Sequence, residues 1–299
     1  MLVLPLVFLL ILGLIVGSFL NVLIYRLEGK KRKTLGGRSF CPKCEKKIPW
    51  HDNIPIVSWL ALQGKCRKCK KEISVQYPLV ELGTGFLFGL IGMKYLFPAI
   101  LGLDSGQARM TNGISTLFVI PASLSVIPAQ AGIQSFVGIL GLAFWLFFAS
   151  ALMVIFVYDL KHQIIPDEVV YPALIAGLAF VLLNFSINLN TKFAIDHLFT
   201  ALLAGGFFYS LAAVSNGKWM GGGDIKLAAF MGLVLGWQGM SVALYTAFVL
   251  GALVGVFALL SGKKKLGSKI PFGPFLVVGT FIGLFFAEKI ISFYGRMFL

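Results

Sequence analysis

The chain has 299 residues, of which 58% are hydrophobic and only 13% are charged, and its mean hydropathy is +0.89. A soluble protein of this length carries nearly twice that density of charge, and several apolar runs approach the ~20 residues that span a bilayer. The composition therefore excludes a soluble globular protein and predicts an all-α, polytopic integral membrane protein with about eight transmembrane helices.

Apolar runs separated by polar or glycine-rich breaks mark the expected spans. Their approximate bounds are 2–24, 78–97, 136–158, 168–186, 197–215, 225–238, 240–261 and 271–290. The sixth run is short, and its break from the seventh falls at Gly236-Trp237-Gln238-Gly239. The first run follows no basic segment and precedes no small-residue cleavage site, so we expect a retained helix with an outside N-terminus.

Positive charge gathers in the loops that alternation of the spans then places inside the cell. These loops are 26–77, 159–167, 216–224 and 262–270. The net charge is +14, and residues 26–77 alone hold 14 of the 26 Lys and Arg residues. The pattern satisfies the positive-inside rule and favours contact with anionic membrane lipid. A basic loop can also bind nucleic acid, but the topology explains the charge with fewer assumptions, so no nucleic-acid partner is expected.

All four cysteines lie in the first inside loop, as Cys41-Pro42-Lys43-Cys44 and Cys66-Arg67-Lys68-Cys69. Two C-x-x-C pairs with 21 residues between them are typical of a four-thiolate zinc site in a small ribbon-like loop. A disulfide or redox role is the alternative, and a reducing cytoplasm disfavours it. We therefore predict a structural zinc ion that orders a loop too polar to form a core.

Residues 98–135 form a long outside loop rich in Ser, Gly, Pro and Ala, without a helical period. We interpret this loop as an extracytoplasmic insertion and assign it no function.

Two aspartates stand at the cytoplasmic edge of expected spans. Asp159 ends the third span, and Asp224 begins the sixth after Gly221, Gly222 and Gly223. An ionisable group at a membrane boundary is costly unless it has a task, and two carboxylates in a low-dielectric site suggest an aspartic-protease dyad. The end of one helix disfavours a carboxylate at Asp159, and the start of another favours one at Asp224. The three glycines allow backbone geometry closed to other residues and let a substrate chain approach.

Simpler interpretations exist for each aspartate. Asp159 could pair with Lys161 or His162, and Asp224 could cap its helix or pair with Lys226. Asp167 and Glu168 suit the acidic first turn of the fourth span. Two functions from other classes also remain open, a transporter with an aspartate proton relay and a membrane zinc sensor or scaffold. A relay favours acids at mid-bilayer depth, whereas both aspartates map to one edge.

Motifs along nearly the whole chain, apart from 98–135, together resemble one family. They are Gly17-Ser18-Phe19-Leu20-Asn21-Val22 with Tyr25-Arg26, both cysteine pairs, Asp52-Asn53-Ile54-Pro55, Gly64-Lys65-Cys66, Tyr77-Pro78-Leu79-Val80-Glu81-Leu82, the 159–167 segment, Gly223-Asp224-Ile225-Lys226-Leu227 and Pro271-Phe272-Gly273-Pro274. In this order they resemble the bacterial prepilin peptidase family, the type IV prepilin leader peptidases.

The resemblance implies an intramembrane aspartic peptidase with Asp159 and Asp224 as catalytic residues. Such enzymes remove the leader of type IV prepilins or type II secretion pseudopilins and then N-methylate the new N-terminal residue with S-adenosylmethionine. It implies a multi-pass protein of the bacterial inner membrane whose active site faces the cytoplasm. The expected domains are 1–97, associated with methyl transfer, the insertion 98–135, and a six-helix peptidase domain over 136–299.

The residues for methyl transfer are less directly indicated, because the chain has no glycine-rich Rossmann fingerprint. Glu81 is the only acid in the second span, near its cytoplasmic end. It could bind the new amino terminus or the cationic cofactor, or act as a base; the alternative is a structural ion pair with Arg26. Asn21 and Arg26 are further candidates.

Overall fold

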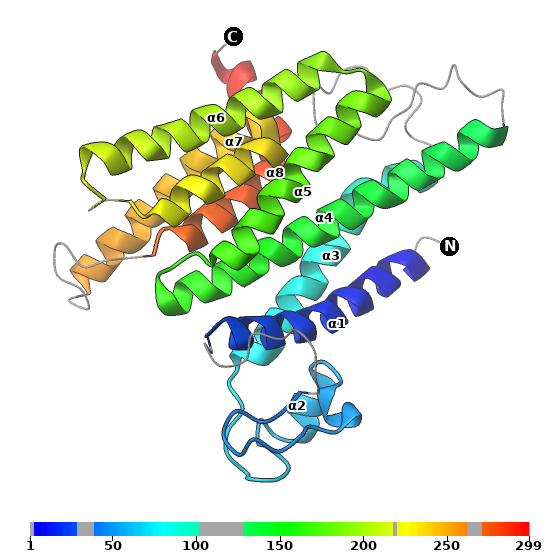
Figure 1. The fold of residues 1–299 in the computed structure, drawn as a ribbon, viewed down its shortest axis with the longest axis vertical. Coiled ribbons are helices and arrows are strands. Elements are labelled where there is room, and N and C mark those ends of the chain that lie inside the picture. The colour runs from blue at the N-terminus through cyan, green and yellow to red at the C-terminus, as the bar shows by residue number, and fades with distance from the viewer. Residues whose placement is uncertain (1–2, 29–38, 102–127, 218–219, 262–270, 299) are drawn as a thin grey trace. The chain divides into compact units, whose positions relative to one another are not determined.

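A computed structural model describes residues 3–28, 39–101, 128–217, 220–261 and 271–298. In chain order the elements are α1 (Val3–Glu28), the 3-10 helix η1 (Trp50–Asn53), α2 (Val57–Ala61), α3 (Gln76–Leu101), α4 (Pro128–His162), α5 (Asp167–Asn188), α6 (Thr191–Val214), α7 (Gly222–Leu260) and α8 (Gly273–Phe298). No strand occurs among these residues beyond two isolated bridges. The predicted all-α fold is confirmed (Figure 1).

Six helices in the described ranges are long and apolar enough to cross a membrane: α1, α4, α5, α6, α7 and α8. The expected count of eight spans is not confirmed. Helix α7 covers two expected spans, 225–238 and 240–261, as one element, and α3, which covers the expected span 78–97, is not among the six. Of the loop expected at 98–135, residues 98–101 and 128–135 are helical instead, as the end of α3 and the start of α4, and residues 102–127 lie outside the described residues.

The chain folds into two compact units. One comprises Met1–Leu103 with Trp145–Val154, and the other comprises Asp104–Phe144 with Ile155–Leu299. Helix α4 therefore contributes residues to both units.

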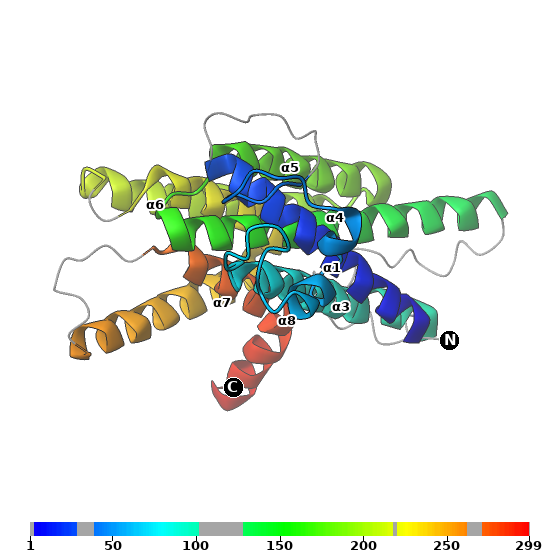
Figure 2. The ribbon, with the colours of Figure 1, turned by 90° about the horizontal axis from the view of Figure 1, so that it is seen from below.

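In the first unit, α1 and α3 pack through glycines. A Cβ added to Gly13 would lie 2.7 Å from the Cα of Gly85, and a Cβ on Gly17 would lie 2.7 Å from the Cα of Glu81. Small residues let membrane helices approach to backbone contact, because apolar burial gains little between helices that lipid already surrounds. The close contact fixes the relative register of the two helices. The segment between them, which contains η1 and α2, lies over the end of α1 and the start of α3 (Figures 1 and 2).

The second unit is an antiparallel helical bundle. Helix α6 packs on the first half of α7, where a Cβ on Gly232 would lie 2.7 Å from the Cα of Ala201. Helix α8 packs on the second half of α7, with Gly283 against Gly239 and Ala243. Large apolar side chains such as Leu202 and Leu253, 78% and 62% exposed, remain on the outside of this unit, as lipid contact requires.

Helix α7 is broken at Gly236, whose φ of 62° and ψ of −176° are not helical. Two residues of α6 hold the break: Asp196 Oδ2 accepts the N–H of Trp237 at 3.1 Å, and His197 Nδ1 lies 2.8 Å from the carbonyl oxygen of Leu233. The second half returns to the end of the unit where α7 began, because Gly251 contacts Phe272 beside the start of α8. The break that the sequence indicated at 236–239 is therefore a reversal.

Candidate functional site

Asp159 occupies the last turn of α4 and is 4% exposed. The backbone N–H of Gly273, the first residue of α8, donates a hydrogen bond to its carboxylate. A Cβ on Gly273 would lie 2.5 Å from Asp159 Oδ2, so only glycine fits there without displacing the carboxylate. From its sequence position Asp159 was expected at a helix end that disfavours a charged carboxylate. The start of α8, which favours a negative charge, lies against the same group and could not be predicted from that position.

Asp224 is the third residue of α7, and its Oδ2 accepts the N–H of Gly221 at 3.2 Å. The side chain is close enough to Asp159 for an electrostatic interaction between the two carboxyl groups. Two acids that are far apart in the sequence therefore lie near one another at one end of the second unit.

The three glycines before Asp224 have different roles. None of them has a positive φ, so the expectation of backbone geometry closed to other residues is wrong here. Gly223 instead allows close packing, because a Cβ would lie 2.8 Å from the Cβ of Ile165. Around Gly222 an added Cβ would meet nothing within 4 Å, so packing among the described residues does not require glycine there.

Asp167 and Lys226 form an ion pair with a distance of 2.7 Å between Oδ1 and Nζ. The Lys226 ammonium also lies 4.6 Å from the ring centroid of Tyr171. The sequence left open that Lys226 pairs with Asp224. In the structure Lys226 joins the first turns of α5 and α7 through Asp167.

The cysteine module, residues 39–73, is built from two similar knuckles. In the first, Cys41 donates its N–H to the carbonyl of Lys46 and accepts the N–H of Glu45; in the second, Cys66 does the same with Lys71 and Lys70. The positive φ angles of Glu45 and Lys70, 56° and 58°, close the two turns in the same way. Each knuckle therefore presents two thiols from one tight turn.

The four cysteine sulfurs lie within 4.8 Å of one another, and none is in a disulfide. The Sγ atoms of Cys41 and Cys69 are 4.0 Å apart. A tetrahedron with Zn–S distances of about 2.3 Å has edges of about 3.8 Å, so the four thiols fit a zinc ion after small adjustments. Hydrogen bonding from the backbone N–H of Cys69 lowers the pKa of the Cys66 thiol to about 7, and burial raises the pKa of Cys41 to about 11.

Asp52 and Arg67 tie η1 to the second knuckle. Arg67 Nη2 lies 2.7 Å from Asp52 Oδ1, and its Nε lies 2.8 Å from Oδ2, a bidentate pair. The Asp52 side chain is only 6% exposed, whereas that of Arg67 is 53% exposed.

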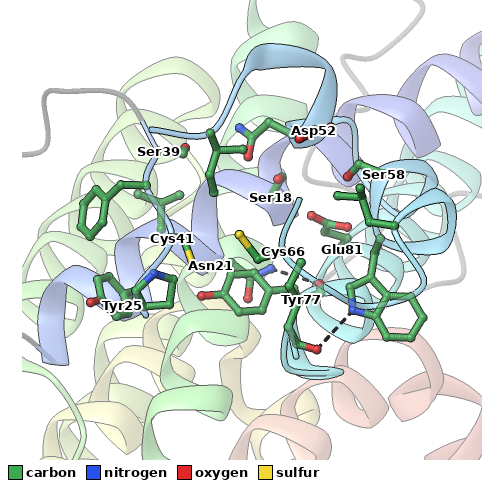
Figure 3. Close-up of a pocket in the computed structure, with 18 of the residues that line it drawn as sticks. Ser18, Asn21, Tyr25, Ser39, Cys41, Asp52, Ser58, Cys66, Tyr77 and Glu81 are labelled. Carbon is green, nitrogen blue, oxygen red and sulfur yellow. Dashed lines mark hydrogen bonds between the residues drawn. The ribbon is translucent and has the colours of Figure 1, made fainter. Parts of the chain in front are cut away.

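A pocket lies between the cysteine module and the adjoining ends of α1 and α3 (Figure 3). All three residues that the sequence analysis linked to methyl transfer, Asn21, Arg26 and Glu81, line this pocket, as do Cys41 and Cys66. Glu81 is 6% exposed, and its carboxylate accepts a hydrogen bond from the N–H of Ile56 at 2.8 Å. The expected alternative, a pair with Arg26, is not among the contacts of Glu81 in the described chain.

Two family models match the chain. The model described as Bacterial Peptidase A24 N-terminal domain matches residues 11–95, and the model described as Type IV leader peptidase family matches residues 146–256. The first match contains the pocket-lining helices and the cysteine module, and the second contains both aspartates.

Curated relatives are similar over nearly the whole length. A prepilin leader peptidase/N-methyltransferase of Stutzerimonas stutzeri is 32% identical, with 95% of this chain and 92% of the relative covered. Proteins of the same name from Pseudomonas aeruginosa and Bacillus subtilis are 32% and 31% identical, covering 97% of this chain and 94% and 97% of the relatives. No solved structure matches the chain.

Proposed function

The chain belongs to the type IV leader peptidase family, and from this membership we propose that it cleaves prepilin leaders as an intramembrane aspartic peptidase. Its substrates are type IV prepilins or type II secretion pseudopilins. The observation that carries the mechanism is the meeting of Asp159 and Asp224, from α4 and α7, at one end of the second unit.

The surroundings of the dyad suit a peptidase. One carboxyl activates water while the other protonates the carbonyl oxygen or the leaving amine of the scissile bond. The N–H of Gly273 holds Asp159 and the N–H of Gly221 holds Asp224, so both side chains are oriented before substrate arrives.

Replacement of either aspartate by asparagine tests the proposal. We expect Asp159→Asn and Asp224→Asn each to abolish cleavage of a prepilin by the purified full chain, while the protein still inserts in the membrane. Asp196→Asn is the matched control, because Asp196 lies on α6 beside the break in α7, away from the dyad, and asparagine can still accept the Trp237 N–H. Retained cleavage in both dyad variants would exclude the aspartic mechanism.

The second proposed activity is N-methylation of the new N-terminal residue, since the relatives are named peptidase and N-methyltransferase. When bound, S-adenosylmethionine supplies the methyl group. The proposed domains are 1–97 for methyl transfer and 136–299 for cleavage. Pre-cleaved pilin with labelled S-adenosylmethionine tests this activity separately, and absence of transfer by the wild type would reduce the function to cleavage alone.

Zinc is proposed as a structural ion on Cys41, Cys44, Cys66 and Cys69, where four protein ligands leave no open position for catalysis. The proposed location is the bacterial inner membrane, with the dyad facing the cytoplasm. This orientation follows from the basic loops, and it presents the dyad to the basic leader of a prepilin. Reversing the charge of that leader should weaken substrate binding.

A further inference from the structure

Large apolar side chains are exposed on the surface of η1 and α2. Trp50 is 76% exposed, Val57 and Leu60 are each 61% exposed, and Ile54 is 41% exposed. Val57 and Leu60 lie three residues apart on α2, so they share one side of this helix. Four such side chains in one short stretch of a polar module mark a contact surface, whereas singly scattered ones would not. We call these four residues the outer face of the module.

The opposite side of α2 is turned toward α1. Ser58 and Trp59 of α2 line the same pocket as Ser18 and Asn21 of α1. The apolar run of α1 extends to residue 24, so Ser18 lies roughly 9 Å before the end of this run at 1.5 Å per residue. The module therefore flanks the last turns of a membrane-spanning helix and does not stand beyond its end (Figure 1).

Helix α3 places the module at the same depth. The N–H of Ile56, immediately before α2, donates a hydrogen bond to Glu81 at 2.8 Å. Glu81 is in the second turn of α3, inside the apolar run expected at 78–97. Leu79 and Leu82 beside it are 62% and 51% exposed, so α3 presents apolar side chains to its surroundings at this level. The outer face of the module consequently lies where lipid headgroups meet the acyl chains.

The charge of the module complements an anionic membrane surface. Residues 39–73 contain eight Lys and Arg and three acids, and all eight basic residues are exposed. One of the three acids, Asp52, is paired with Arg67. Basic groups near an anionic bilayer are attracted to it, and Trp is enriched at the membrane interface. Basic residues around exposed Trp and aliphatic side chains are typical of segments that lie in the membrane surface.

We propose that the outer face of the module inserts in the membrane, in the leaflet next to the end of α1, while the surrounding Lys and Arg bind anionic headgroups. The partner is thus an anionic phospholipid. A protein partner would fit the apolar side chains equally well, but the depth of α2 beside α1 and α3 favours lipid. The proposal is independent of the dyad and of methyl transfer. It adds lipid to the contact with α3 that holds the module in place.

Tryptophan fluorescence tests the depth of this face in the full chain. We would reconstitute Leu60→Trp in nanodiscs that contain phosphatidylglycerol and measure the emission that the substitution adds to that of wild type. Lipid with brominated acyl chains quenches a side chain buried in the bilayer, and acrylamide quenches one in water. Lys43→Trp, at an exposed position of the first knuckle, is the matched control. Trp50→Phe is a second variant that removes a native reporter, and zinc content checks that each variant is folded.

We expect brominated lipid to quench the added emission of Leu60→Trp at least threefold more strongly than that of Lys43→Trp, and acrylamide to show the reverse order. Trp50→Phe should lower the part of the wild-type emission that brominated lipid quenches, and this difference decides alone if Leu60→Trp loses zinc. Quenching at position 60 by acrylamide only would overturn the proposal, because the face is then in water. Resistance to both quenchers would also overturn it, because protein then covers the face. Equal quenching in nanodiscs of phosphatidylcholine alone would overturn the assignment of anionic headgroups.

Discussion

Gly273 shows how one missing side chain shapes the dyad. Its N–H supports Asp159, and a methyl group at this position would lie 2.5 Å from Oδ2. We predict that Gly273→Ala displaces the carboxylate and lowers the rate of prepilin cleavage at least tenfold, since catalysis depends steeply on placement. The control is Gly295→Ala in the same helix, where an added Cβ meets nothing within 4 Å. Equal cleavage rates for the two variants would show that Gly273 begins α8 without positioning Asp159.

Asp52 permits a prediction about pH. The Arg67 guanidinium holds the pKa of the Asp52 carboxyl below its ordinary value. A lowered folded-state pKa stabilises the module at every pH above the unfolded value of about 3.9, and the contribution is lost only as pH falls further. Zinc release instead follows protonation of the thiols, which occurs at higher pH. We therefore expect Asp52→Asn to cost about 1 kcal/mol of stability, given the exposure of Arg67, without moving the pH midpoint of zinc release.

A chromogenic zinc indicator measures that midpoint, and thermal unfolding measures the stability. Glu45→Gln, an exposed acid in the same module, is the control and should change neither quantity. A midpoint shifted upward in Asp52→Asn alone would mean that the carboxylate controls metal retention directly.

Residues that act through local spacing were predictable, and residues that act through tertiary contact were not. The two cysteine pairs predicted a four-thiolate site because the two thiols of each knuckle lie within one short segment of the sequence. The motif around Gly273 was visible, but its role depends on α8 lying against the end of α4, which no local pattern indicates. The positive φ of Ile56, 61°, was not predicted for the same reason.

At the scale of elements, single substitutions in the zinc knuckles and in the dyad should affect methylation and cleavage separately. We predict that Cys66→Ser lowers zinc content and methylation of pre-cleaved pilin more than it lowers prepilin cleavage, because the knuckle forms a pocket wall in the first unit and the dyad lies in the second. Asp159→Asn should show the reverse pattern. Parallel loss of both activities in Cys66→Ser would mean that the zinc module supports the whole protein.

The reversal of α7 is a second element that a substitution can test. Gly236 has a positive φ, and an added Cβ would lie 3.0 Å from His197 Nε2 and also meet Asp196. We predict that Gly236→Ala destabilises the protein by about 1–3 kcal/mol in thermal unfolding. Gly206→Ala is the control, since its surroundings in α6 are open. The sequence indicated this break from composition, but the α6 side chains that hold it came only from the structure.

At the scale of the whole molecule, the predicted orientation of the chain in the membrane can be tested by labelling. Lys192 at the start of α6 belongs to the end of the second unit that holds Gly236, whereas Ser261 follows the returning half of α7 near the dyad end. We predict that an impermeant maleimide labels Lys192→Cys in intact cells and leaves Ser261→Cys unlabelled. The unsubstituted chain is the control, because its own cysteines lie in a loop expected inside. Labelling of Ser261→Cys from outside would invert the orientation and place the dyad on the wrong face.

The bond from Gly273 to Asp159 has a consequence for biogenesis. Asp159 and Asp224 both leave the ribosome before α8, yet the first of them is held by a group that α8 provides. A nascent chain that has inserted both acids but not α8 still lacks the Gly273 N–H that supports Asp159. If the two acids form the proposed dyad, a chain stalled before α8 carries both of them without the Gly273 N–H that supports Asp159, and we expect it to show no cleavage of prepilin.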